Sequence, residues 1–430
     1  MRRILAAASV LLGFPSVLAA CDNPNADVLN NHVTCEFERA TKLIVDCRCQ
    51  EKRRTLLDCN NPENSAVPTT ARVGTGPSLF PLMFTATIRI GPGYLDPVKR
   101  EFYPAISFDD SRGAYQGFVL GVDLDTGNRR LVSGSIPGQG DRGNGPPIDG
   151  PRVTDIGPDG KLYVWSESAV HMKIFRVDLD TGDRELVWSD YDFTQTDTNI
   201  AEHAQCEIPT GNGQTTYPQT NENGFAVGPD GSFYVNVFQF GAGGVAKIAP
   251  DGHACSWLTL WDAASVGDPT FKDVGTGPAG DNTNFTALKY NKATNTVWGI
   301  GFFGSLTSID VATGDRTAVM DVRGGTGTYS IATSTELQIA VLGGTDAPAS
   351  VITVIDLPNN RVYEPTCTIN PPYPDVGCVG NAENGPFPLT LQHLQPTWID
   401  PKNGNLIMAN GNVAFFRGEL STGNTILWSL

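Results

Sequence analysis

The stretch DGPRVTDIGPDGKLYVWSESAVHMKIFRVDLDTGDRELVWSD, residues 149–190, decides the fold of this chain. It predicts four short strands joined by three turns, and the strands are rich in aromatic and β-branched residues. Proline presets φ and glycine adopts positive φ without steric cost. The Pro-Asp-Gly sequence at 158–160 therefore predicts one tight turn, and the Thr-Gly pair at 181–182 predicts another. One such sheet cannot bury both of its faces, so we expect further copies to stack against it.

Copies of the last two strands and their turn recur along the chain. Six copies align, at residues 118–135, 174–190, 243–261, 305–322, 350–367 and 413–430. The strand before a copy, such as KLYVW at 161–165 or SFYVNVF at 232–238, is apolar on both faces. Such a strand belongs to a sheet packed between two neighbours, as propeller blades are. Residues 71–430 therefore predict an all-β, six-bladed β-propeller, and VPTTARVGTGP at 67–77 could add a seventh blade.

Two short regions precede the propeller. Residues 1–20 have two arginines, an apolar run and small residues at the end, which predicts an export signal too short to remain as a membrane span. The sequence LAAC at 18–21 resembles the bacterial lipobox, whose cysteine becomes the lipidated N-terminus. This resemblance implies lipidation of Cys21, and the alternative is ordinary secretory cleavage after Ala19 or Ala20. Residues 21–70 then form a lipid-anchored tether and a small Cys-rich segment.

The cysteine count supports the prediction of export and lipidation. The chain has nine cysteines, and removing Cys21 as the lipid carrier leaves an even number for disulfides in an oxidising compartment. The eight predicted disulfide cysteines are Cys35, Cys47, Cys49, Cys59, Cys206, Cys255, Cys367 and Cys378. We expect Cys367 to pair with Cys378 and Cys206 with Cys255. The N-terminal four then allow three connectivities. A four-thiolate zinc site is the alternative for these four, although their spacing lacks CxxC knuckles.

The charge balance limits the partners. The formal charge is −16, and the leader carries arginines but no acidic residue, so its removal leaves the chain more acidic still. Strong acidity argues against nucleic acid and anionic lipid surfaces as partners. We therefore expect a monomer in the bacterial cell envelope, facing the periplasm or the exterior, with a secreted protein as the alternative. Contact with the membrane would be through the N-terminal lipid.

Several motifs of the repeats have a structural interpretation. Asp123, Asp178, Asp310 and Asp356 end the third strand of their copies, and Glu419 occupies the place in the sixth. We expect these side chains to accept turn N–H groups rather than to bind calcium, because the rest of a calcium loop is missing. The Gly-rich segments GTGP at 74–77 and 275–278, and QGDRGNGPP at 139–147, predict inter-blade connections with tight turns near the propeller axis.

The motifs PDGKLYV and PDGSFYV, each followed by a V-D-x-x-T-G or I-A-P-D-G hairpin, resemble NHL-repeat and SMP-30/gluconolactonase-like six-bladed propellers. NGFAV at 223–227 resembles the SMP-30 segment in which Asn-Gly presents a metal ligand at the start of an inner strand. Asp149 and Asn284 occupy comparable places one blade earlier and one blade later. The resemblance thus implies a calcium site formed by Asp149, Asn223 and Asn284. The glutamate ligand of the family, normally in an EGP-like motif of the first blade, is not evident. ENGP at 383–386 matches that motif only in part and falls in a different blade.

Two classes of function remain open. The first is a binding module of the envelope, acting on an unknown small molecule or envelope protein. The long polar insertion at 191–222 and the Pro-rich segment at 364–378 suit contact surfaces. The alternative is a calcium-dependent, SMP-30-like lactonase or esterase with its site at the channel mouth. The sequence does not decide whether the protein is an enzyme, and it contains neither HExxH nor GxSxG.

Overall fold

The computed structural model describes a large part of the chain from residue 75 onward. The described residues are 75–77, 87–109, 115–167, 172–189, 208–209, 215–216, 224–239, 242–263, 272–279, 285–301, 305–321, 328–334, 339–344, 352–356, 361–364, 377–378, 394–400, 405–410, 414–419 and 425–429. The predicted signal, tether and Cys-rich segment lie outside them. Within the described part, no helix reaches the length and apolarity that a membrane span requires.

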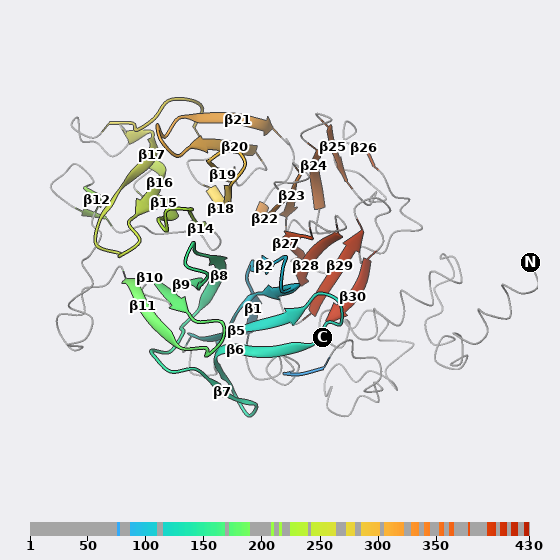
Figure 1. Ribbon diagram of the computed structural model, residues 1–430. Helices are drawn as coiled ribbons and strands as arrows, with labels where there is room; N and C mark the ends of the chain where they lie inside the picture. The colour runs from blue at the N-terminus through green and yellow to red at the C-terminus, as the bar shows by residue number, and fades with distance from the viewer. Residues whose placement is uncertain are drawn as a thin grey trace, which may run out of the picture.

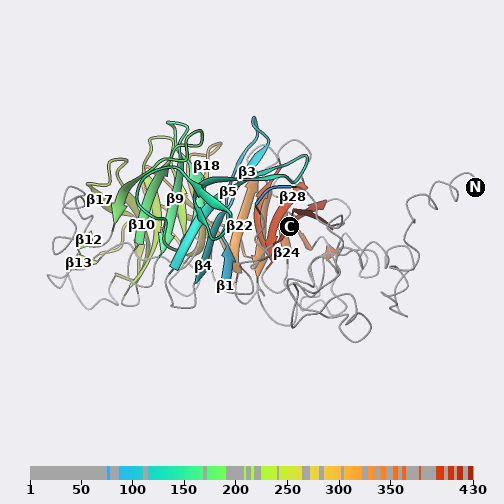
Figure 2. The ribbon, with the colours of Figure 1, turned by 90° about the horizontal axis from the view of Figure 1, so that it is seen from below.

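The described strands form six large sheets arranged around a central axis (Figure 1), which is the architecture of a six-bladed β-propeller. The first strand of each sheet lies nearest the axis, and the view from below shows the sheets side by side in a flat disc (Figure 2).

The blades follow the chain in order. Blade 1 contains β1 (Thr87–Ile90), β2 (Tyr94–Asp96), β3 (Glu101–Tyr103), β4 (Ala105–Asp109), β5 (Tyr115–Asp123), β6 (Arg129–Ile136) and β7 (Gly140–Arg142). Blade 2 contains β8 (Pro151–Ile156), β9 (Leu162–Glu167), β10 (Met172–Val177) and β11 (Arg184–Ser189). Blade 3 contains β14 (Phe225–Val227), β15 (Phe233–Gln239), β16 (Ala242–Ile248) and β17 (Cys255–Trp261).

Blade 4 contains β18 (Phe285–Asn291), β19 (Thr296–Gly301), β20 (Ser305–Asp310) and β21 (Arg316–Asp321). Blade 5 contains β22 (Thr328–Ser334), β23 (Ile339–Gly344), β24 (Ile352–Asp356), β25 (Arg361–Glu364) and β26 (Gly377–Cys378). Blade 6 contains β27 (Leu394–Ile399), β28 (Asn405–Asn410), β29 (Ala414–Glu419) and β30 (Thr425–Ser429). A separate hairpin, β12 (Ile208–Pro209) with β13 (Thr215–Thr216), precedes blade 3.

Blade 1 has seven strands because its two inner strands are interrupted and because a short fifth strand, β7, pairs with β6 at the outer edge. β1 and β2 form one first strand broken at Gly91-Pro92-Gly93, and β3 and β4 form one second strand broken at Pro104. Proline has no N–H to donate to a ladder, so a strand breaks where it occurs. The Pro92 carbonyl instead accepts the Thr154 N–H of blade 2 at 3.1 Å. Blade 1 therefore has the four strands of its neighbours and the short edge strand β7 in addition.

The four strands predicted within residues 149–190 are confirmed by β8 to β11. The predicted third and fourth strands appear in all six blades, and their hairpins pair antiparallel. The described part contains six blades. Residues 75–77, at the end of the segment that could have formed a seventh, form a connection to blade 1, and the residues before 75 lie outside the described part.

The hydrophobic core lies in layers between neighbouring blades. The layer between blades 2 and 3 stacks Trp165 on Trp188 and on Phe225, with ring centroids 5.9 Å and 5.7 Å apart. Similar layers join blades 1 and 2, blades 3 and 4, and blades 4 and 5. Blades 2, 3 and 4 are thus covered on both faces, so their strands can be apolar on both faces, as the sequence predicted.

Among the described residues, side chains and not a shared strand connect the first and last blades. Each of blades 1 and 6 is built from its own segment of chain. Between them, Arg100 Nη1 donates to both carboxylate oxygens of Asp400 at 2.9 Å, and the Asp400 side chain is 3% exposed. Nearby, the rings of Tyr94 and Trp398 meet edge to face at 5.7 Å.

Candidate functional site

Three blades carry the same polar joint on their outer hairpins. In blade 2, the entering connection places Asn144 N 2.7 Å from Asp183 Oδ1, and Arg184 N donates to Asn144 O at 2.7 Å. The same two bonds, at the same lengths, recur in blades 1 and 4. We call these joints the rim latches. They join connection residues 75–77, 144–146 and 276–278 to turn residues 126–129, 181–184 and 313–316.

An arginine completes each rim latch and can reach the preceding blade. Its Nε donates to a proline carbonyl of the connection, at 2.7 Å for Arg129, 2.9 Å for Arg184 and 2.8 Å for Arg316. The Arg184 guanidinium also donates to Ser133 Oγ of blade 1 at 3.0 Å, and that of Arg316 donates to Leu260 O of blade 3 at 3.3 Å. A planar fork with five donors suits this role, because it satisfies several acceptors at once.

Glycine is required where the latch turn meets the preceding blade. Gly182 and Gly314 have φ of 83° and 78°, which side chains rarely adopt. A Cβ on Gly182 would overlap the Val132 carbonyl, and one on Gly314 would overlap the Leu258 carbonyl. The Gly-rich segments are therefore connections, as predicted, except that Gly140–Arg142 form strand β7 of blade 1. The connections dock on outer hairpins. The prediction that their turns lie near the axis is wrong, because their partners are the third and fourth strands.

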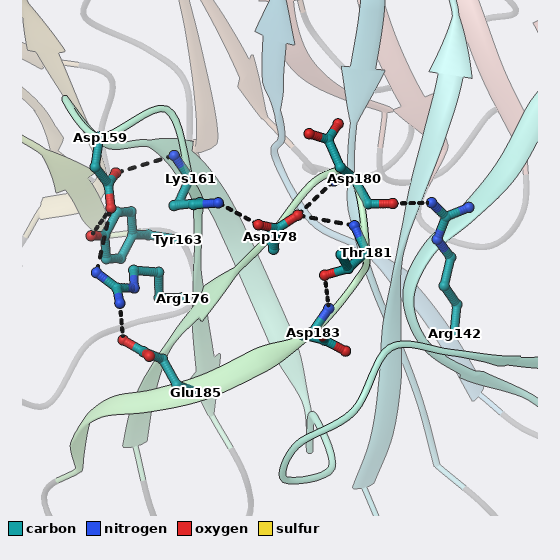
Figure 3. A network of polar contacts seen from close by, with 10 residues as sticks. All are labelled: Arg142, Asp159, Lys161, Tyr163, Arg176, Asp178, Asp180, Thr181, Asp183 and Glu185. Carbon is teal, nitrogen blue, oxygen red and sulfur yellow. Dashed lines mark hydrogen bonds and ion pairs between the residues drawn. The ribbon is translucent and has the colours of Figure 1, made fainter.

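The repeated aspartates cap these turns, as the sequence predicted. Asp178 Oδ1 accepts Asp180 N at 2.8 Å and Thr181 N at 2.9 Å (Figure 3). Asp123 and Asp310 make the equivalent pairs of bonds, at 2.7 to 3.0 Å. The Lys161 ammonium, which bonds to Asp178, is the first cause of the low pKa of that carboxyl. The turns after Asp356 and Glu419 lie outside the described residues.

The predicted calcium ligands can be followed only in part. Asn223 and Asn284 lie outside the described residues, so the proposed grouping with Asp149 stays a prediction. Asp149 Oδ2 lies 2.7 Å from the Lys173 ammonium, whereas its Oδ1 is buried without a hydrogen-bond partner among the described residues. Within the described part, no three His, Cys, Asp or Glu side chains come together as a metal site.

Most of the predicted lipidation and disulfide cysteines also lie outside the described residues: Cys21, Cys35, Cys47, Cys49, Cys59, Cys206 and Cys367. The backbone of Cys378 is described, and its side chain is not. Cys255, at the start of β17, takes part in a disulfide bond. Its partner is not among the residues whose side chains are described, so the pair with Cys206 stays a prediction.

The first strands place one residue each at the same level of the axis. Their register against the second strands identifies the set, because Tyr94, Asp155, Ala226 and Lys289 each lie opposite an aromatic residue. The same position in blades 5 and 6 lies opposite Val341 and Ile407. We call these six residues the axial ring: Tyr94, Asp155, Ala226, Lys289, Ala332 and Trp398.

Two alanines flank Lys289 in the axial ring. Ala332 of blade 5 stands between Lys289 of blade 4 and Trp398 of blade 6, and the Lys289 ammonium lies 5.2 Å from the centroid of the Trp398 ring. Ala226 of blade 3 likewise stands between Lys289 and Asp155, which interact electrostatically. The alanines thus allow side chains two blades apart to meet across the axis.

Lys289 is the most unusual member of the ring. It is 4% exposed, and its ammonium has no hydrogen-bond partner among the described residues. Burial lowers its pKa, and the charge of Asp155 opposes that shift. Asp155 itself is tied to the backbone, since Oδ1 accepts Ile156 N at 2.9 Å and Oδ2 accepts Val227 N at 3.0 Å.

Tyr94 contributes a neutral phenol to the axial ring. Burial, followed by the charges of Asp96 and Asp155, raises the pKa of Tyr94 to about 12, so its phenol keeps its proton at neutral pH. Its backbone N–H donates to Thr154 Oγ1 at 2.9 Å, which ties β2 to β8 beside the ring. The ring therefore combines one cation, one anion and two aromatic side chains from four blades.

The sequence prediction placed the site where the first strands begin, whereas the axial ring lies near their ends. The overlooked signal was a polar or aromatic residue at the same register of three apolar first strands: VTDIG at 153–157, ALKYN at 287–291 and PTWID at 396–400. A lysine within an apolar inner strand has few neighbours that can satisfy it, which marks the position.

The fold defines the class of this protein as a six-bladed β-propeller. No family model matches the chain, and no curated protein matches it. Solved structures do align with it. TolB from Acinetobacter baumannii is 12% identical with a TM-score of 0.38, over 78% of this chain and 62% of that chain. The present chain thus spans less than two thirds of that TolB chain.

Two other solved structures align over more of their length. The WD40 domain of Neurospora crassa Pan2 is 12% identical, with a TM-score of 0.38 over 80% of this chain and 79% of that one. An oligogalacturonate lyase in complex with manganese is 10% identical, with a TM-score of 0.40 over 81% and 79%. These likenesses do not bear on activity, and the propeller assignment rests on the sheets themselves.

Proposed function

We propose that this chain is an exported propeller, anchored through a lipid on Cys21, that binds a small ligand on its axis as a module of the cell envelope. The observation that carries the proposal is the axial ring, where the Lys289 ammonium is buried without a hydrogen-bond partner among the described residues. Buried donors are normally satisfied, so such a group supports a role in binding.

The polar groups of the outer hairpins support the assignment of ligand binding to the axis, because they already have structural partners. The repeated aspartates, latch arginines and connection residues bond to one another, and this use accounts for their recurrence in the sequence. Ligand binding can then be assigned to the axis, where the four large ring residues are chemically different from one another. The NHL-like and SMP-30-like motifs of the sequence suit the same architecture.

A calcium-dependent lactonase or esterase is the second candidate, and one observation favours it. Asp149 lies just before β8, and its Oδ1 is buried with no hydrogen-bond partner among the described residues. A hard cation such as calcium binds carboxylate oxygens of this kind. The adjacent Lys173 ammonium weighs against it, because a second cation on the same carboxylate would be repelled.

Three measurements test the proposal. Mass spectrometry of the membrane-extracted protein should find an acylated N-terminal Cys21, and Cys21→Ser should release the protein. Dialysed protein should bind no calcium and hydrolyse no member of a lactone panel. Calcium bound in stoichiometric amount, with lactone turnover lost in Asp149→Ala and kept in Lys173→Met, would instead establish the enzyme.

A further inference from the structure

We propose that the axial ring binds a small monocarboxylate with an apolar or aromatic body, whose carboxylate accepts hydrogen bonds from the Lys289 ammonium. This inference rests on the proposed binding function and specifies its ligand. It follows from three features of the ring: an unused cationic donor, a fixed anion nearby and an aromatic wall.

The donor comes first. An ammonium has three N–H donors and no acceptor, so its complement is an oxygen with lone pairs. Burial makes an unmet donor costly, and it also strengthens any charge-assisted bond that forms there. In the observed conformation, the Lys289 Nζ has no hydrogen-bond partner among the described residues.

Asp155 sets the charge of the ligand. Its carboxylate is held by two backbone N–H groups, at 2.9 Å and 3.0 Å, and it does not bond to Lys289. A monoanion would neutralise the Lys289 charge, while the Asp155 carboxylate keeps its hydrogen bonds from the backbone N–H groups. A phosphate or sulfate dianion would add a second charge beside the fixed carboxylate, which is unfavourable in a buried site.

The aromatic wall sets the body of the ligand. The Trp398 ring lies under the Lys289 ammonium, and the Tyr94 ring packs on Trp398 edge to face. Aromatic rings next to a polar anchor select ligands that carry apolar carbon beside their charge. The alanines at positions 226 and 332 keep the neighbouring places in the ring small.

Titration calorimetry of sodium benzoate into the full-length, membrane-extracted protein tests the inference, with sodium acetate, phosphate and sulfate as comparison probes. We expect benzoate to bind more tightly than acetate, and phosphate and sulfate not to bind. Lys289→Met, which keeps the length of the side chain, should weaken benzoate at least tenfold.

Lys247→Met is the matched control. Lys247 lies 5.9 Å from the centroid of the Tyr234 ring, but it is paired with Asp230 at 2.9 Å on the surface of blade 3. This variant should bind benzoate as the wild type does. Thermal melting of each variant confirms that it is folded.

Absence of benzoate binding by the wild type, equal binding by Lys289→Met, or preference for phosphate would each overturn the inference. A ring that holds water alone would produce the first of these results. Failure of the proposed function looks different: a non-lipidated Cys21 or calcium-dependent lactone turnover would remove that proposal and leave the benzoate result unchanged.

Discussion

Lys247 on an outer strand and Lys289 on an innermost strand both lie over an aromatic ring, at 5.9 Å and 5.2 Å from its centroid. Lys247 is partly exposed and bonds to Asp230, whereas Lys289 is buried and has no such partner within the described part. The same contrast separates the rim latches from the axial ring. At the rim, polar groups satisfy one another and hold the blades together. At the axis, backbone N–H groups satisfy Asp155, whereas the Lys289 ammonium has no hydrogen-bond partner among the described residues.

The rim latches and the Lys289 ammonium also differ in what they contribute to the free energy of folding. A satisfied buried network stabilises a fold, whereas an unmet buried donor costs free energy that the rest of the structure must offset. Removing a rim arginine should therefore destabilise the protein, and removing the axial lysine should not. The predictions below test this difference, from the largest expected effect to the smallest.

Arg316→Ala should cause the largest loss. Arg316 is 5% exposed, and its guanidinium donates to acceptors in the connection and in blade 3, including Pro278 O at 2.8 Å and Val274 O at 3.1 Å. Leaving these acceptors unmet should lower the free energy of unfolding by about 3 to 5 kcal/mol. Urea unfolding measures this, with Arg142→Ala as the control. Arg142 is partly exposed and its guanidinium donates to Asp180 O at 2.7 Å, so we expect a cost of under about 1 kcal/mol. Equal losses would show that the rim latch is not special.

Asp400→Asn should cause the next largest loss, because it weakens the closure between blades 6 and 1. Asparagine keeps the shape but removes the charge that faces Arg100, so we expect a cost of about 2 to 4 kcal/mol. Asp125→Asn is the matched control, since Asp125 pairs with the same arginine but is 61% exposed. A larger loss in the control would contradict closure through Asp400.

The dependence of the free energy of unfolding on alkaline pH should show the burial of Lys289, which has no hydrogen-bond partner among the described residues. Burial lowers the pKa of Lys289, so near neutral pH and above, the unfolded chain binds at least as many protons at this site as the folded chain. The stability of the wild type should therefore rise relative to Lys289→Met as pH increases toward about 10.4, the usual lysine pKa. A constant difference between the two proteins across urea titrations at several pH values would contradict this.

Acid pH should have the smallest effect of the four. Hydrogen bonds from Asn144 and from Thr276 lower the pKa of the Asp183 and Asp315 carboxyls. Their stabilisation is therefore present above about pH 4, the usual value for aspartate, and is lost as pH falls through the lower folded pKa. Melting temperatures of Asp183→Asn and wild type should converge in acid. A gap that widens in acid would exclude this role.

The fold could be predicted because it depends on local patterns. The strand and turn residues of 149–190 specify a blade by themselves, and repetition specifies the stacking. The capping role of Asp178 could also be predicted, because its partners are two and three residues away. The broken strands of blade 1 were not predicted. Gly-Pro-Gly at 91–93 is typical of a loop, and only its pairing with the second strand shows that it interrupts one long strand.

The axial ring could not be predicted in the same way. Lys289, Trp398 and Asp155 are far apart in sequence, and only the ring geometry places them at one level. The latch partners were hidden for the same reason, because Arg316 bonds to a connection about forty residues earlier. A motif shows what a residue can do, whereas a long-range partner decides what it does.

Urea unfolding of Lys289→Met and Lys247→Met, each with and without benzoate, tests the central claim most directly. The account predicts that Lys289→Met is at least as stable as the wild type, by up to about 1 kcal/mol, because methionine removes the unmet buried charge. It also predicts that benzoate stabilises the wild type and Lys247→Met but not Lys289→Met. A Lys289→Met protein that is markedly less stable than the wild type and still gains stability from benzoate would show that the axis, like the rim, serves only the fold.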